Sequence, residues 1–172
     1  MVDLETMGTR PGCAIVAIGA VSFTTDGIAS EFYQQVDLES CQRAGMHLDG
    51  GTVKWWLTQD EKVRQAVTGP GIDVYSALLQ FRAWLAQGGG EPCVWGDGAA
   101  FDNAILHEAF RLCKLGIPWS YTHDRCYRTV RGLFPSVKWA RKGTCHHALD
   151  DARDQALHLL EIFKKLNGQA SS

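Results

Sequence analysis

The sequence predicts an α/β protein in which helices flank a mixed sheet of antiparallel and parallel strands. Residues 14–23 form an almost continuous apolar run rich in Val and Ile, which is typical of a strand buried on both faces. Turn residues at 24–27 and a second strand-like segment at 28–36 indicate an antiparallel hairpin. Further along the chain, helical and strand-like segments alternate, and this order favours an α/β sheet.

The N-terminal half begins with a short strand that is expected to end near Asp3, because only two residues precede that carboxylate. After the hairpin, short helices are predicted at 52–58 and 61–68, and residues 69–71 (Gly-Pro-Gly) break the chain. A longer helix follows at 72–87 and ends at three glycines. Its buried face is predicted from the helical period to contain Ile72, Tyr75, Leu79 and either Trp84 or Leu85.

The C-terminal half predicts one short strand at 92–96 and two helices. The helix at 100–115 is expected to place these residues on one face: Phe101, Ile105, Ala109 and Leu112. The last helix, at 147–166, is expected to do the same with Leu149, Ala152, Ala156, Leu159 and Phe163. The length then predicts a single domain over residues 1–168, followed by a short polar tail at 169–172.

Composition is that of an ordinary globular protein, with 45% apolar and 21% charged residues. No apolar run is long enough to span a bilayer and no signal-peptide pattern opens the chain, so no membrane partner is expected. The six cysteines are scattered without a Cys-x-x-Cys pair. This spacing argues against a zinc site and predicts buried, reduced thiols in a cytoplasmic protein.

Five residues in three separate patches carry the predicted chemistry: Asp3, Glu5, Asp102, His146 and Asp151. Alternate residues on a strand leave by the same face, so Asp3 and Glu5 would reach one site. Asp102 would lie in the first turn of its helix, where the helix dipole favours a carboxylate. His146 is expected on the loop before the last helix, because residues five apart do not share a helix face. Four carboxylates with one histidine suit hard divalent cations, which prefer oxygen ligands.

The three patches resemble the motifs of DEDD-type 3′–5′ exonucleases, in the subgroup with a histidine (DEDDh), of the ribonuclease H-like superfamily. The first motif, Asp-x-Glu-Thr, spans residues 3–6, the second ends in Phe-Asp at 101–102, and the third, His-x-Ala-x-x-Asp, spans 146–151. Their order and rough spacing match along almost the whole chain. The segments Asp-Leu-Glu-Thr-Met-Gly and Thr-Val-x-Trp-Trp also resemble a bacterial and phage branch of the family.

The resemblance implies a ribonuclease H-like mixed sheet and two divalent cations, Mg²⁺ or Mn²⁺, held by the four carboxylates. Asp3 would bridge both ions. Glu5 and Asp151 would support the ion that binds the nucleophilic water, and Asp102 would support the other. His146 would accept the proton of that water near neutral pH. The family also implies the cytoplasm of a bacterium or of a phage-infected host. Many relatives are dimers, so a homodimer is an expectation of the resemblance, although no self-association signal stands out.

Eight further residues are predicted to contact the nucleic acid: Thr6, Met7, Trp55, Trp56, Phe101, Lys138, Arg141 and Lys142. Met7 stands where family members place an apolar wedge beside the terminal base, and core packing is an equal alternative. Trp55 and Trp56 are adjacent and would point about 100° apart on a helix. One of the two is therefore expected in the core, while the other is a candidate for stacking on a base.

Residues 125–143 contain six basic side chains and no acidic one. The aromatic residues interleaved with them are Tyr127, Phe134 and Trp139. Basic groups and aromatic rings together suit a groove that follows a single strand of nucleic acid. The alternative interpretation is a solvated, partly helical loop.

The predicted function is a metal-dependent 3′–5′ exonuclease that releases nucleoside monophosphates from the 3′ end of single-stranded DNA or RNA. One alternative is an exoribonuclease that trims short oligoribonucleotides or RNA 3′ overhangs. Another is a non-catalytic module that binds nucleic acid on the same fold. The latter would require a damaged site, and no ligand position of the motifs is substituted.

Overall fold

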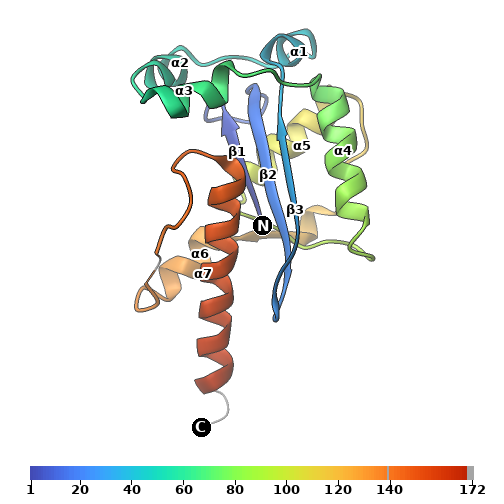
Figure 1. The fold of residues 1–172 in the computed structure, drawn as a ribbon. Helices are drawn as coiled ribbons and strands as arrows, with labels where there is room; N and C mark the ends of the chain where they lie inside the picture. The colour runs from blue at the N-terminus through green and yellow to red at the C-terminus, as the bar shows by residue number, and fades with distance from the viewer. Residues whose placement is uncertain (139, 170–172) are drawn as a thin grey trace.

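The protein folds around a five-stranded sheet with the strand order β3-β2-β1-β4-β5 (Figure 1). The computed structural model describes residues 1–138 and 140–169, apart from the side chains of Ala66 and Gln169. Trp139 in the basic stretch and residues 170–172 of the predicted polar tail therefore lie outside the described residues. Gln169, which was assigned to that tail, is the last residue of a helix.

The sheet is mixed, as the sequence predicted. β1 (Val2–Thr6) pairs antiparallel with β2 (Ile15–Thr24), which pairs antiparallel with β3 (Gly27–Gln35). β4 (Val94–Gly96) runs parallel to β1, and β5 (Asp124–Cys126) runs parallel to β4. The predicted hairpin is therefore β2–β3, and the two short strands extend the sheet on the other side of β1.

Seven α-helices lie among the described residues: α1 (Leu38–Arg43), α2 (Gly50–Leu57), α3 (Glu61–Thr68), α4 (Val74–Ala86), α5 (Asp102–Leu112), α6 (Tyr127–Leu133) and α7 (Ala148–Gln169). Each of the first four begins directly after an aspartate whose side chain accepts a hydrogen bond from a backbone N–H of the first turn. A short 3₁₀ turn (Tyr121–His123) precedes β5. None of the helices in the described part of the chain is long and apolar enough to cross a membrane.

Side chains of the central strands point alternately to the two faces of the sheet, and each face carries its own apolar layer. Val2 and Leu4 of β1 pack in the larger layer with α4 and α5. Val21 of β2 packs in the smaller layer with Ala152 and Leu159 of α7. Figure 1 shows α7 in front of the sheet and α5 behind it. β2 is buried from Ile15 to Val21, as expected for a strand covered on both faces.

Several element predictions were wrong in detail. β1 does not end near Asp3 but continues through Thr6, because it pairs with β2 along its whole length. The first predicted helix, 52–58, spans Gly50–Leu57 and starts at the cap provided by Asp49. Three elements were not predicted, namely α1, β5 and α6. All are short, and segments of three to seven residues give little periodic signal.

The buried face of α4 was also predicted wrongly. The residues that it buries are Val74, Ala77, Leu78 and Phe81. Tyr75 and Leu79, which were expected in the core, are among the exposed large apolar side chains. Phe81 instead packs against Phe32 of β3 and against Trp119. The apolar residues surround much of this helix, so the sequence offers two competing stripes, and tertiary packing selects one of them.

All six cysteines are free thiols. Cys13 and Cys41 are buried, as predicted, but Cys93 and Cys145 are exposed. The prediction of buried structural thiols therefore holds for only part of the set.

Candidate active site

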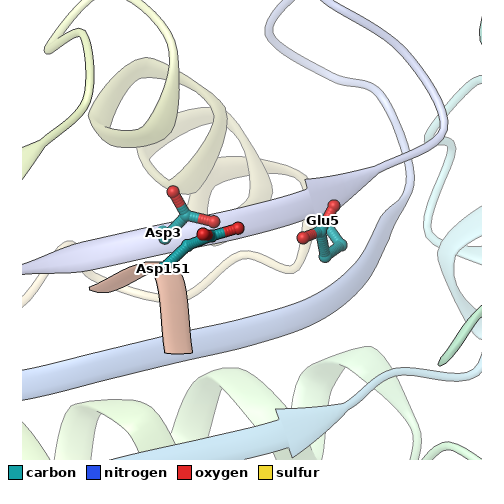
Figure 2. Close-up of side chains that lie close together, drawn as sticks. All are labelled: Asp3, Glu5 and Asp151. Carbon is teal, nitrogen blue, oxygen red and sulfur yellow. The ribbon is translucent and has the colours of Figure 1, made fainter. Parts of the chain in front are cut away.

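Strand β1 presents Asp3 and Glu5 on the face of the sheet that α7 covers. The register pairs Asp3 with Gly19 and Glu5 with Ala17 of β2. Residues directly opposite one another in an antiparallel pair share a face, so two small residues stand beside the two carboxylates. Figure 2 shows both acidic side chains projecting from the strand toward Asp151 of α7.

Gly19 allows the first turn of α7 to lie directly against the sheet. A Cβ atom at this position would fall far inside van der Waals contact with the carbonyl group of Ala148 and the amide nitrogen of Leu149. The close approach brings Asp151 over the strand that carries the other two acids. As a result, one ligand oxygen from each of Asp3, Glu5 and Asp151 lies within 4.8 Å of the others. These three residues are called the acidic cluster below.

Asp102 approaches the acidic cluster from the opposite layer. It is the first residue of α5, as predicted, and its Oδ1 accepts a hydrogen bond from the backbone N–H of Leu4 at 3.2 Å. A Cβ at Gly96 would lie only 2.9 Å from Oδ2 of Asp102, so the glycine that ends β4 makes room for this carboxylate. That Oδ2 is buried and has no hydrogen-bond partner among the described residues. Asp102 is outside the cluster of three, but its charge acts on Asp3.

Gln155 is a site residue that the sequence interpretation missed. Its Nε2 donates a hydrogen bond to Oδ1 of Asp3 at 2.7 Å, and its side chain is buried. Gln155 stands four residues after Asp151, so both lie on the same face of α7. That spacing was the available signal, since a polar residue one turn after a ligand faces the same site.

Burial raises the pKa values of all four carboxyl groups, and repulsion from neighbouring carboxylates adds to the effect. Desolvation is the largest cause in each case. It acts with the charges of Asp102, Glu5 and Asp151 to raise the pKa of Asp3 well above its ordinary value. The pKa of Glu5 rises to about 8 and that of Asp102 to about 7. The pKa of Asp151 also rises because of burial, although the charges of Arg141 and His146 oppose the shift. The site therefore concentrates negative charge that requires protons or cations.

The four carboxyl groups form a donor set that fits hard divalent cations. All the donors are carboxylate oxygens, which is the ligand type that Mg²⁺ and Mn²⁺ prefer. The unpaired buried Oδ2 of Asp102 and the raised pKa values both indicate groups whose neutralising partner is a cation. The arrangement is consistent with the predicted ligand set.

His146 lies on the loop before α7, as predicted, and its backbone has φ of 59°. Non-glycine residues adopt this left-handed conformation only rarely, and such residues often occur at functional sites. The imidazole packs edge-on against Trp55, with ring centroids 4.9 Å apart. Trp55 is 41% exposed, whereas Trp56 is 4% exposed and its Nε1 donates to the carbonyl of Thr6 at 2.9 Å. Trp56 is therefore the core residue of the pair, and Trp55 has its surface available beside His146.

His147 has a different position from its neighbour. Its carbonyl accepts a hydrogen bond from the backbone N–H of Asp151, and its Nδ1 accepts a weaker one, at 3.4 Å, from that of Asp150. The ring stacks on Tyr33 of β3 at 4.7 Å between centroids. The histidine was predicted to lie within the helix, but it stands one residue before it and supports its first turn.

The remaining candidates from the first two motifs are partly or wholly buried. Met7 is buried in the larger apolar layer, which corresponds to the alternative of core packing rather than to a wedge beside the base. The Oγ1 of Thr6 donates to the carbonyl of Gly8 at 2.7 Å. Phe101 lies directly before α5 and is partly buried against the same layer.

The described residues of the basic stretch 125–143 do not line one continuous groove, because their side chains lie in separate places. Arg128 and Arg131 of α6 gather around Asp97, and Nη2 of Arg128 donates to the carbonyl of Asp97 at 2.6 Å. Lys138 and Lys142 are exposed and border a small hollow beside α7. Arg141, by contrast, reaches the acidic cluster, with its Nη2 3.0 Å from Oδ1 of Asp151.

Residues 1–163 match the family described as the 3′-5′ exoribonuclease Rv2179c-like domain. The chain belongs to this family. A search of curated proteins gave no significant match. The family and the fold together support a 3′–5′ exonuclease activity, and a DEDDh exonuclease implies dependence on divalent metal ions.

Solved structures show the same fold. The nuclease domain of 3′hExo, a DEDDh family member bound to rAMP, shares 16% identity over 95% of this chain and 90% of that chain, with a TM-score of 0.63. A structure that describes 3′-end specific recognition of the histone mRNA stem-loop by a 3′-exonuclease shares 13% identity over 95% of this chain and 81% of that chain, with a TM-score of 0.61. Cell-death related nuclease 4 shares 14% identity over 95% of this chain and 63% of that chain, with a TM-score of 0.59. The predicted ribonuclease H-like fold and the DEDDh resemblance are thereby confirmed.

Metal ions should stabilise the protein more strongly as the pH rises. Folding raises the pKa of Glu5 to about 8 and that of Asp102 to about 7, so the stability these groups contribute when protonated is lost as the pH rises through those values. The ionised groups then bind cations, which offsets the loss. We expect the increase in Tm on replacing EDTA with Mg²⁺ to grow from about pH 5 to about pH 8.5. Glu5→Gln should reduce this growth, and an increase in Tm that is independent of pH would contradict the assignment.

Proposed function

We propose that residues 1–168 form a metal-dependent 3′–5′ exonuclease domain that hydrolyses phosphodiester bonds from the 3′ end of single-stranded nucleic acid and releases nucleoside monophosphates. One observation carries the proposal. Asp3 and Glu5 from the start of the chain and Asp151 from its end form one cluster, Asp102 from the middle binds the backbone between the first two, and His146 lies on the loop beside Asp151. A surface cluster of acids would not be buried in this way, nor would it be assembled by two glycines that permit close backbone approach.

The four carboxylates Asp3, Glu5, Asp102 and Asp151 would hold two divalent cations, Mg²⁺ or Mn²⁺. When bound, such cations polarise the phosphate and lower the pKa of a water molecule. Gln155 would keep the carboxylate of Asp3 oriented through its hydrogen bond, because ligand orientation depends on such outer partners.

His146 would accept the proton of the attacking water. Histidine is the side chain that most often serves as a general base near neutral pH. The ring of His146 contacts the exposed Trp55, and its charge acts on Asp151 in the first turn of α7. A terminal base stacked on Trp55 would therefore bring the 3′ end next to the general base, since stacking on an aromatic side chain requires no particular base.

The family description favours RNA as the substrate. The matched family is described as an exoribonuclease, and two of the similar structures are described with rAMP and with a histone mRNA stem-loop. An exoribonuclease that trims short oligoribonucleotides or RNA 3′ overhangs is therefore the second candidate. It uses the same residues and the same chemistry.

A labelled-strand time course tests the proposal. Matched single-stranded DNA and RNA oligonucleotides, labelled at either end, should lose 3′ nucleotides as monophosphates in Mg²⁺ or Mn²⁺ and remain intact in EDTA. An RNA preference would select the second candidate. Undiminished cleavage by metal-free protein would end the metal-dependent assignment. Binding without cleavage in every metal would instead indicate the non-catalytic module.

A further inference from the structure

A cation supplied by the protein already lies against the acidic cluster. Nη2 of Arg141 is 3.0 Å from Oδ1 of Asp151, and the side chain of Asp151 is only 9% exposed. The charge of Arg141 opposes the rise in the pKa of Glu5 as well as the rise in that of Asp151. One guanidinium group therefore acts as the counter-ion of two members of the cluster.

A divalent cation and Arg141 would share the same carboxylate. A cation held by the cluster would bind oxygens of Asp3, Glu5 and Asp151, which lie within 4.8 Å of one another. Like charges close to one carboxylate repel each other, in a region where burial weakens solvent screening. Binding of the metal must then weaken the Arg141–Asp151 pair, and the pair must weaken binding of the metal by the same factor.

The backbone next to Arg141 is fixed, so its side chain is the part that can change partner. The backbone N–H groups of Lys142 and Gly143 donate to Oδ2 of Asp154 at 2.8 and 3.0 Å. Asp154 is buried on α7. The long side chain of Arg141 is 35% exposed and can turn about this anchor toward solvent. A guanidinium fork also matches the geometry of a phosphate group.

We infer that Arg141 exchanges partners: it neutralises Asp151 while the acidic cluster is free of metal, and divalent cations displace it toward a phosphate of the bound strand. The inference rests on the proposed function. Arg141 is then a positioning residue for the substrate, and its release from Asp151 depends on binding of the metal. The exchange also keeps the cluster partly neutralised before metal binds.

Calorimetric titration with Mn²⁺ tests the first half of the exchange, at about pH 8.5, where protons compete least for the carboxylates. Arg141→Gln removes the charge at similar length and should bind Mn²⁺ about tenfold more tightly than the unaltered protein, the factor that corresponds to about one pKa unit of charge interaction. Arg141→Lys keeps the charge and should bind like the unaltered protein. Lys142→Gln removes a charge from the next, exposed position and should leave Mn²⁺ affinity unchanged.

Steady-state kinetics on a single-stranded oligonucleotide at saturating Mg²⁺ test the second half. Arg141→Gln should raise KM about tenfold with little change in kcat, and Arg141→Lys should recover part of the loss. Equal or weaker Mn²⁺ binding by Arg141→Gln would overturn the inference and leave the proposed function standing. If Arg141→Gln bound Mn²⁺ more tightly but had an unchanged KM, the proposed move of Arg141 to a phosphate of the substrate would be overturned. An unaltered protein that binds no Mn²⁺ would overturn the proposed function, and the inference with it.

Discussion

Replacing His146 with asparagine should lower the single-turnover cleavage rate by about 10²–10⁴-fold, the usual contribution of a general base. Asparagine tolerates the left-handed backbone conformation that His146 adopts, so the loop should keep its shape. The four carboxylates remain, and Mg²⁺ and the substrate should still bind. Mn²⁺ affinity and the dissociation constant of a single-stranded oligonucleotide should stay unchanged in the same variant.

His147→Asn is the matched control for this experiment. An asparagine before α7 can still accept a hydrogen bond from the first turn, as Nδ1 of His147 does from Asp150. The variant loses the stacking on Tyr33 and the charge interaction with the carboxylate of Asp150, neither of which involves the acidic cluster. Its cleavage rate should therefore change little, and any loss should follow stability. If His147→Asn were the inactive enzyme and His146→Asn were close to wild type, the third motif would be aligned wrongly by one residue.

The sequence predicted the positions of the candidate site residues better than it predicted their partners. Asp3 and Glu5 could be placed on one face because strand alternation is a local property. Asp102 could be placed in the first turn of its helix for a similarly local reason, namely its position two residues after the predicted start of that helix at residue 100. These predictions needed only the element type and its start, and the structure has both.

The partners of the site residues depend on contacts between distant segments, which a single sequence does not reveal. Gln155 reaches Asp3 across 152 positions, and Arg153 binds Glu31 across 122. The basic stretch was treated as one feature because no acidic residue interrupts it. In the fold its first part contains α6, whose Arg128 and Arg131 gather around Asp97, whereas Tyr127 and the backbone of residues 142–143 contact α7. The faces of α4 were misassigned for the same reason, since packing against Phe32 and Trp119 decided between two apolar stripes.

Gly19 shows how a residue without chemistry of its own can control the site. In the sequence it is one glycine within an apolar strand, where glycine usually weakens the strand and often marks a close approach of another segment. In the fold it pairs with Asp3 and lies under the first turn of α7. Any side chain at this position must therefore separate Asp151 from the strand that carries Asp3 and Glu5.

Gly19→Ala should for this reason impair both stability and activity. The new methyl group would overlap backbone atoms of Ala148 and Leu149, which cannot move aside as the end of a flexible side chain can. Overpacking of this kind costs about 1–3 kcal/mol in the free energy of unfolding, measured by urea denaturation. Displacing α7 by about 1 Å would move Asp151 away from the other ligands and should lower kcat/KM by about 10²-fold.

Gly132→Ala is the control for the change from glycine to alanine. Gly132 is exposed within α6, and a Cβ there would have no neighbour within 4 Å. That variant should keep full activity and gain up to about 1 kcal/mol of stability, because alanine favours a helix over glycine. Mn²⁺ affinity, measured where Gly19→Ala is still folded, separates displacement of Asp151 from a general loss of structure: displacement weakens Mn²⁺ binding in the folded variant. A folded Gly19→Ala protein with normal Mn²⁺ affinity and normal kcat/KM would show that the close approach of α7 to β2 does not set the position of Asp151.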